Sequence, residues 1–108
     1  MNKLSLTVLL LLSQNAMSQN NHCLVYENNP RYLKAITTVA QTYNMSLNDI
    51  CTSEKYLAIE AQPSRKYTRE GEIIPHVRVQ LHMYSSSCLY MVKDSDQSLT
   101  EVKCYSGE

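Results

Sequence analysis

The chain contains no tryptophan and no phenylalanine, and only two of its 108 residues are glycine. Eight tyrosines therefore supply all of the aromatic bulk. A tyrosine ring packs well in a core when its hydroxyl reaches water or a polar partner, so we expect a core that uses tyrosine. The same residues could instead mark a binding face, where tyrosine is enriched. Gly71, the only glycine before Gly107, lies in a polar segment that predicts a hairpin tip or a long loop.

The chain also lacks a charge excess, with ten basic and ten acidic side chains. Nucleic-acid binding needs a clear basic excess, and docking on anionic membranes does too. Neither partner is therefore expected. No two cysteines are closely spaced, and the three histidines do not cluster with them, so no metal site and no cofactor are predicted.

Beyond residue 13 the chain has no long apolar run. Before it, "MNK" supplies a positive charge, "LSLTVLLLLS" is apolar, and small residues follow at Ala16 and Ser18. This order is typical of a secretory signal peptide, and its apolar part is well short of the roughly 20 residues that span a bilayer. We predict a signal peptide over 1–18, cleavage after Ser18, and a single secreted, extracellular domain over 19–108.

All four cysteines, Cys23, Cys51, Cys88 and Cys104, lie in that mature part. An even number of cysteines in a short secreted chain indicates disulfides. Domains of this size bury too little apolar surface to do without such bridges in many cases. We expect two bridges, and four cysteines allow three pairings.

The first half of the mature chain has the period of a helix. Leu33, Ile36, Ala40 and Tyr43 recur at helical spacing, which predicts a helix over 30–43. Asn29 is a suitable cap and Pro30 suits the first turn, while Asn44 could close the helix in the left-handed conformation. Before it, Cys23–Tyr26 could form a short strand. After it, Ser46 and Asp49 resemble a capping pair that would start one more helical turn.

From Tyr56 the period changes to two, which predicts strands. Pro63 interrupts the first strand or marks it as an edge strand. The polar segment "SRKYTREGE" is a hairpin tip or a long loop. Beyond Pro75, Val77, Val79, Leu81 and Met83 alternate with polar residues, as in a half-buried antiparallel strand. Two more strands, "CLYMVK" and "SLTEVKCY", flank the turn-forming "DSDQ".

The register of the last hairpin can be counted from a turn centred on Asp96. The count places three pairs opposite each other on one face of the sheet: Val92 and Thr100, Tyr90 and Val102, and Cys88 and Cys104. A disulfide fits such a position where the pair is not hydrogen-bonded. This register proposes Cys88–Cys104, and Cys23–Cys51 follows by elimination.

The predicted fold class is α+β, with one N-terminal helix packed on an antiparallel sheet of four to five strands. The segment "HVRVQLHMYSSSC … EVKC" resembles the C-terminal half of secreted cystatins, in which a bridge also joins the last strands. The helix over 30–43 matches the helix around which a cystatin sheet wraps. The resemblance implies a secreted cystatin-like binding protein, and a papain-like cysteine protease as its partner if it is a divergent inhibitor.

Cystatin inhibitors fill the protease cleft with an N-terminal segment that carries a glycine, a first hairpin with Gln-x-Val-x-Gly, and a second hairpin with Pro-Trp. None of these motifs occurs here. The first hairpin falls on "REGEII" and the second turn is "DSDQ". The resemblance therefore puts an acidic edge in the binding position, formed by Arg69, Glu70, Gly71, Glu72, Asp94 and Asp96.

Two other functions fit the residues. A secreted non-inhibitory ligand or carrier, such as a signalling or reproductive-fluid protein, would use its tyrosines and the basic "RKYTRE" to contact a receptor. A small hydrolase would need converging histidines. His76 and His82 lie on the polar face of one strand, roughly 20 Å apart, so we expect surface histidines and no enzyme. "NMS" makes Asn44 a candidate glycosylation site.

Overall fold

The fold is described here from a computed structural model, for residues 21–106. The predicted signal peptide and its cleavage site lie outside the described residues. In chain order the elements are a short 3₁₀ helix η1 (Leu24–Tyr26), the helices α2 (Pro30–Gln41) and α3 (Leu47–Thr52), and the strands β1 (Ala58–Tyr67), β2 (Ile73–His82), β3 (Ser86–Lys93) and β4 (Leu99–Ser106). The fold class α+β is confirmed.

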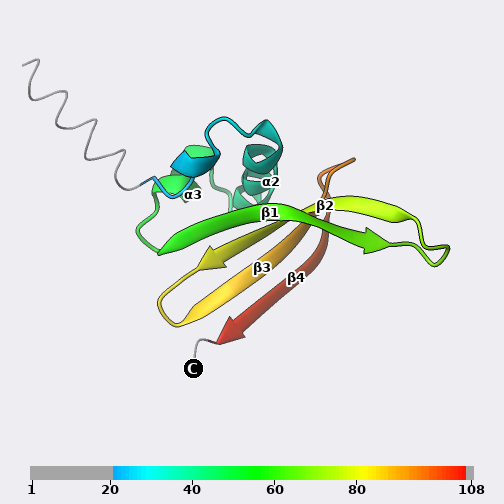
Figure 1. The fold of residues 1–108 in the computed structure, drawn as a ribbon. Helices are drawn as coiled ribbons and strands as arrows, with labels where there is room; N and C mark the ends of the chain where they lie inside the picture. Colours follow the sequence, from blue (N-terminus) through cyan, green and yellow to red (C-terminus); the bar gives the residue numbers. More distant parts are fainter. Residues whose placement is uncertain (1–20, 107–108) are drawn as a thin grey trace, which may run out of the picture.

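The four strands form one antiparallel sheet in the order β1-β2-β3-β4. Figure 1 shows both helices on one face of this sheet, with α2 lying across it. The expected count of one helix is wrong, because α3 follows α2. Ser46 and Asp49 cap α3 reciprocally: the Ser46 hydroxyl accepts from the Asp49 backbone at 3.0 Å, and the Asp49 carboxylate accepts from the Ser46 backbone at 3.4 Å.

Helix α2 begins where the capping residues predict. The Asn29 side chain accepts a hydrogen bond from the backbone N–H of Tyr32 at 3.2 Å, and Pro30 occupies the first turn. The helix ends at Gln41, before the expected Tyr43, and Asn44 then adopts a φ of 59°. Its buried face consists of Ala35, Ile36, Val39 and Ala40. Those small and branched side chains let the helix lie close to the sheet.

The core lies between α2 and one face of the sheet. Alternate residues of β1, β2 and β3 fill it, because successive side chains of a strand point to opposite faces of the sheet. They are Ile59, Ala61, Val77, Val79, Leu81, Tyr90 and Val92, all of them buried. Tyr90 is the largest, and its hydroxyl is satisfied by a hydrogen bond with the Tyr43 hydroxyl. Burial and this bond hold the pKa of Tyr90 well above its ordinary value. Tyrosine thus serves the core, as expected.

Both disulfides are present, Cys23–Cys51 and Cys88–Cys104. Cys88 faces Cys104 across β3 and β4, and Tyr90 faces Val102. Both pairs confirm the register that was counted from the turn at Asp96. The third counted pair is wrong: Val92 faces Leu99, because a β-bulge makes Thr100 an extra residue. A bulge of this kind adds one residue to one strand and leaves the pairing on either side intact.

The segment Cys23–Tyr26 is not the expected strand. Leu24–Tyr26 forms η1, and Cys23 is held to Cys51 in α3 by the disulfide. Instead of pairing its backbone with β1, this segment sends the Tyr26 hydroxyl to the edge of β1, where it accepts from the backbone N–H of Ala61 at 2.9 Å. A side chain therefore covers the position that a fifth strand would take.

The expectation that His76 is a surface residue is also wrong, since only 1% of it is exposed. Its Nδ1 donates to the Ile74 carbonyl at 2.8 Å, and its Nε2 lies 2.8 Å from the Thr100 hydroxyl. Nearby, Lys66 of β1 reaches past β2 and β3 and donates to the Thr100 carbonyl of β4 at 3.3 Å. The alternation of side chains predicts on which face of the sheet His76 lies, but it does not reveal that other residues cover His76 on that face.

Candidate binding surface

The two hairpin turns lie at the same end of the sheet. His76 of β2 pairs with Lys93 of β3, so the turn that follows Lys93 is next to the residues that precede His76. The Asp94 N–H donates to the Pro75 carbonyl at 3.1 Å, which joins the two hairpins. The structure therefore gathers the six residues expected to bind a partner at one end: Arg69, Glu70, Gly71, Glu72, Asp94 and Asp96.

The first turn, which joins β1 to β2, is held only by its own residues. The Thr68 N–H donates to the Glu72 carbonyl and the Gly71 N–H to the Thr68 carbonyl, each at 3.0 Å. Gly71 has a φ of 87°, which side-chain-bearing residues seldom adopt. None of the ion pairs found within residues 21–106 involves Arg69, Glu70 or Glu72. These charged side chains are exposed and free to meet a partner.

Next to this turn, β1 and β2 form a two-stranded arm that extends beyond the end of β3. Pairing between β2 and β3 starts only at His76, whereas β2 starts at Ile73. Tyr67 and Ile73 face each other at the tip of the arm, 60% and 56% exposed. By strand alternation they continue the apolar face of the sheet past the helix. Figure 1 shows the arm as the part of the sheet that projects farthest from the helices.

Ile73 was not among the residues expected to bind, and Tyr67 was expected to do so only as part of "RKYTRE" in the ligand hypothesis, not as part of the acidic edge. A signal for this apolar pair was present in the sequence, because both residues lie next to a polar turn. The polar segment "SRKYTREGE" was instead interpreted as a hairpin tip or a long loop. Along the arm, Pro63, Ser64, Arg65, Ile73 and Pro75 line a shallow depression of about 280 Å³. The two prolines and the isoleucine give it an apolar floor.

The second turn, which joins β3 to β4, is tied to α2. Arg31 contacts Asp94 with Nε 2.9 Å from Oδ2, and it also donates to the His76 carbonyl at 3.1 Å. The Thr38 hydroxyl donates to the Gln97 side chain at 2.8 Å. Asp94 was expected to be a free carboxylate at the binding edge, and it is instead engaged by the helix.

Asp96 remains exposed at the tip of the second turn. Its carboxylate accepts from the Ser98 hydroxyl at 2.7 Å and from the Ser98 N–H at 3.1 Å. These bonds favour the charged form and lower the pKa of Asp96. Gln97 beside it has a φ of 59°. The negative charge that the second turn presents to a partner is therefore mainly that of Asp96.

The beginning of the described chain lies elsewhere. The Cys23–Cys51 bridge joins it to α3, and the His22 N–H donates to the Cys51 carbonyl at 2.8 Å. Helix α3 leads into the start of β1, at the end of that strand opposite the first turn. Figure 1 shows η1 and α3 together, away from the tip of the arm. Residues 21–23 therefore do not stand beside the two turns.

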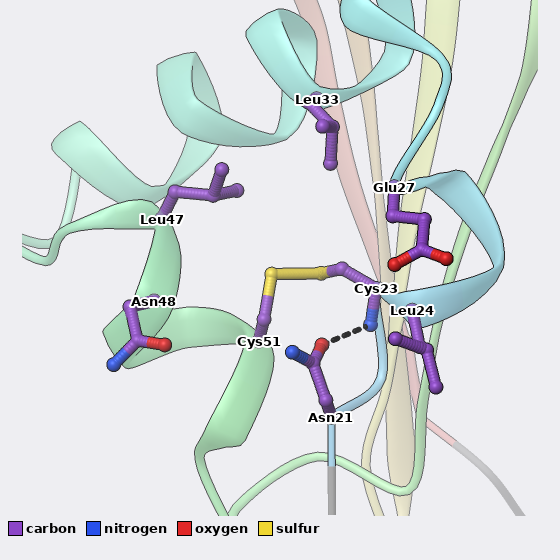
Figure 2. Close-up of a pocket in the computed structure, with 8 residues that line it drawn as sticks. All are labelled: Asn21, Cys23, Leu24, Glu27, Leu33, Leu47, Asn48 and Cys51. Atoms are coloured by element: carbon purple, nitrogen blue, oxygen red, sulfur yellow. Dashed lines mark hydrogen bonds between the residues drawn. A yellow bond between two sulfur atoms is a disulfide. The ribbon is translucent and has the colours of Figure 1, made fainter. Parts of the chain in front are cut away.

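A separate cavity of about 240 Å³ lies between η1, α2 and α3. Figure 2 shows the Cys23–Cys51 disulfide at its centre, with Leu33 and Leu47 pointing in from the two helices and Glu27 at one side. Asn21, Leu24 and Asn48 complete the lining. Its walls are mostly apolar, and Glu27 is the only charged residue among them.

On the outer face of the sheet, His82 connects two polar side chains. Its Nδ1 lies 3.0 Å from the Ser87 hydroxyl and its Nε2 2.8 Å from the Glu60 carboxylate. The sequence analysis did not predict this grouping of a hydroxyl with a base. An acyl-transfer site also needs a cleft and donors for the oxyanion, and neither of the two cavities described above is lined by His82, Ser87 or Glu60. The side chain of Glu60 is 63% exposed. We assign no reaction to these groups.

Asn44 is exposed and lies just after α2, at a φ of 59°. Its placement leaves room for a glycan. Within residues 21–106, no three metal-binding side chains gather in one place. In the same part of the chain, every helix is too short or too polar to cross a membrane.

Comparison with protein-family models, with curated protein sequences and with solved structures finds no match for this chain.

Proposed function

We propose that this protein is a secreted cystatin-like binding protein, which engages a protein partner with the end of the sheet that carries its two hairpin turns. The observation that carries the proposal is the apolar pair Tyr67 and Ile73 at the tip of the projecting arm. Exposed tyrosine and isoleucine beside each other are suited to fill a pocket on a partner, because buried aromatic anchors dominate binding energies. The two disulfides favour an oxidising compartment, as in secreted proteins.

A papain-like cysteine protease is the first partner class to test. The layout of a helix, a sheet and two turns at one end supports it, as does the resemblance of "HVRVQLHMYSSSC … EVKC" to secreted cystatins. The acidic residues Glu70, Glu72 and Asp96 distinguish this edge from that of an inhibitor. Desolvating an unpaired carboxylate is costly, so the partner should present lysine or arginine around an apolar pocket.

The test is inhibition of papain and direct binding to it by the mature protein, residues 19–108. Tyr67→Ala and Ile73→Ser should each weaken binding at least about tenfold, as expected for truncated anchors. Tyr84→Ala is the matched control, because Tyr84 is 87% exposed in the β2–β3 turn at the other end of the sheet. Absence of both inhibition and binding at about 10 μM protein would remove the protease as partner.

The second candidate function is that of a carrier for a small apolar ligand. The cavity around the Cys23–Cys51 bridge favours it, since ligand sites are usually concave and apolar with few polar groups. Titration with Nile red, a neutral apolar dye, tests it. Enhanced fluorescence that is lost in Leu33→Gln and kept in Tyr67→Ala would support the carrier, and no enhancement in the unaltered protein would end it.

A further inference from the structure

Strand β4 is an edge of the sheet, and nothing in residues 21–106 pairs with its outer side. Figure 1 shows it at the border of the sheet, with no helix or loop drawn beside its outer edge. It runs for eight residues, Leu99–Ser106, and contains no proline. An edge of this kind presents backbone donors and acceptors that can pair with another strand.

The positions of these free groups follow from the disulfide. The Cα atoms of Cys88 and Cys104 are 4.0 Å apart, close to the spacing of a pair that exchanges no backbone hydrogen bonds. The N–H and C=O of Cys104 therefore point away from β3. Val102 lies two residues earlier and faces Tyr90 in the same register, so its backbone groups point to the free edge as well.

The opposite edge, on β1, is protected. The Ala61 N–H points to the free side of β1, where the Tyr26 hydroxyl accepts it at 2.9 Å. Pro63, two residues further, occupies the equivalent position and has no N–H. One donor of this edge is thus satisfied and the next is absent. On β4, Lys66 donates to the Thr100 carbonyl at 3.3 Å, but within the described residues no side chain is hydrogen-bonded to the backbone of 101–106.

We propose that β4 pairs antiparallel with β4 of a second copy of this chain, with Val102 on the twofold axis. In such a pair the Val102 backbones exchange two hydrogen bonds, and the two sheets join into one. The interface is isologous, because each copy contributes the same strand. This surface is separate from the hairpin turns, and the inference does not depend on the proposed function.

Charge selects this register over its neighbours. With Val102 opposite Val102, Glu101 of each copy lies opposite Lys103 of the other, so two pairs of opposite charge flank the axis. A shift of the axis by one residue in either direction puts Glu101 opposite Glu101, or Lys103 opposite Lys103. Cross-strand neighbours of like charge are destabilising, while opposite charges are favourable. Within one chain, Lys103 contacts Glu101 at 3.1 Å and is 59% exposed, so its ammonium can reach a second carboxylate.

The helical layer leaves space for the second copy. Helix α2 packs chiefly on β1, β2 and β3. On the helix side of β4, Val102 is consequently 52% exposed. In the proposed dimer the two Val102 side chains cover each other. The bulge at Thr100 limits regular pairing to the residues that follow it.

Sedimentation equilibrium of the mature protein, at concentrations up to about 1 mM, measures the dimer. Glu101→Lys and Lys103→Glu should each raise the dissociation constant about tenfold or more, because each replaces two opposite-charge pairs by like-charge pairs. The double exchange Glu101→Lys with Lys103→Glu restores both pairs in this register alone, and it should recover dimerisation. Glu54→Lys, the same charge change as Glu101→Lys at an exposed site just after α3, should have no effect.

Circular dichroism of each variant verifies that it is folded. A protein that stays monomeric throughout the concentration range overturns the proposal. So does a dimer that is unaffected by either single reversal, or one that the double exchange fails to restore. Recovery in the double variant, with Glu54→Lys unchanged, establishes both the strand and the register.

Discussion

The two hairpin turns lie at the same end of the sheet, yet they are held in different ways. The first turn is stabilised by bonds among Thr68, Gly71 and Glu72, and its arm projects beyond β3. The second turn is tied to α2 through Asp94 and Gln97, and its strands are joined by a disulfide. The difference suggests a rigid reference surface beside a more adaptable arm. Regions with few supporting contacts open most readily.

The largest effect on stability is expected from removal of the Cys88–Cys104 bridge by changing both cysteines to alanine. A loop of this size is worth roughly 3 kcal/mol, so the free energy of unfolding should fall by about that amount. Urea unfolding measures it. The matching Cys23→Ala and Cys51→Ala variant should lose a similar free energy while keeping the second turn's amide-exchange protection. Equal loss of protection at that turn in both variants would show that the bridge does not act locally.

The first turn should depend strongly on its single glycine. Gly71→Ala forces a side chain into a φ of 87°, and we expect a loss of about 1–2 kcal/mol. No atom outside the turn lies within 4 Å of the added methyl, so the loss would come from the backbone conformation and not from a clash. Thermal unfolding measures it, with Ser95→Ala in the second turn as a near-neutral control. An unchanged melting temperature would contradict the expectation.

A smaller effect is expected for the contact between α2 and the second turn. Arg31→Ala removes the bonds to Asp94 and to the His76 carbonyl. Both charged side chains are partly exposed, at 43% and 30%, so we expect a loss of about 0.5–1 kcal/mol. Amide exchange at 94–97 should accelerate while that at 68–72 stays constant. Arg69→Ala, at the first turn, is the control, and an equal change in both turns would argue against a local contact.

The smallest expected effect is that of pH on the second turn. Bonds from Ser98 lower the pKa of Asp96 in the folded protein. A group whose pKa is lowered by folding adds stability above its unfolded pKa, and that stability is lost as the pH falls through the folded value. The second turn should therefore loosen in acid below the ordinary value of 3.8. NMR shifts of Ser98 follow this titration, and Asp96→Asn should abolish it. A titration that persists in Asp96→Asn would assign it to another group.

The helix starts, the register of the last hairpin and the turn at Gly71 were predictable from the sequence. Capping residues located the helix starts, because Asn29 and Ser46 act on neighbours only three residues away. Strand alternation gave the register that joins Cys88 to Cys104. These features depend on local geometry. The role of Gly71 in a turn was likewise evident from its isolation in a polar segment.

What the sequence did not reveal depends on contacts between distant residues. Buried His76 contacts Thr100 of β4, 24 residues away in the chain, and Asp94 is engaged by Arg31 on a helix. The segment that forms the 3₁₀ helix at Leu24–Tyr26 is held by the Cys23–Cys51 disulfide and by the bond from the Ala61 N–H to the Tyr26 hydroxyl. An alternating pattern states which face a side chain occupies. It carries no information on what covers that face.

The contact between α2 and the second turn should affect the rate at which the protein unfolds. Arg31 and Asp94 are 63 residues apart, and Thr38 and Gln97 are 59 apart. Contacts that close such long loops are expected after the nucleus has formed. Weakening them should then hasten unfolding and leave the folding rate nearly unchanged, which stopped-flow measurements on Arg31→Ala would reveal. The helix would thus determine how long the second turn keeps its native shape once formed.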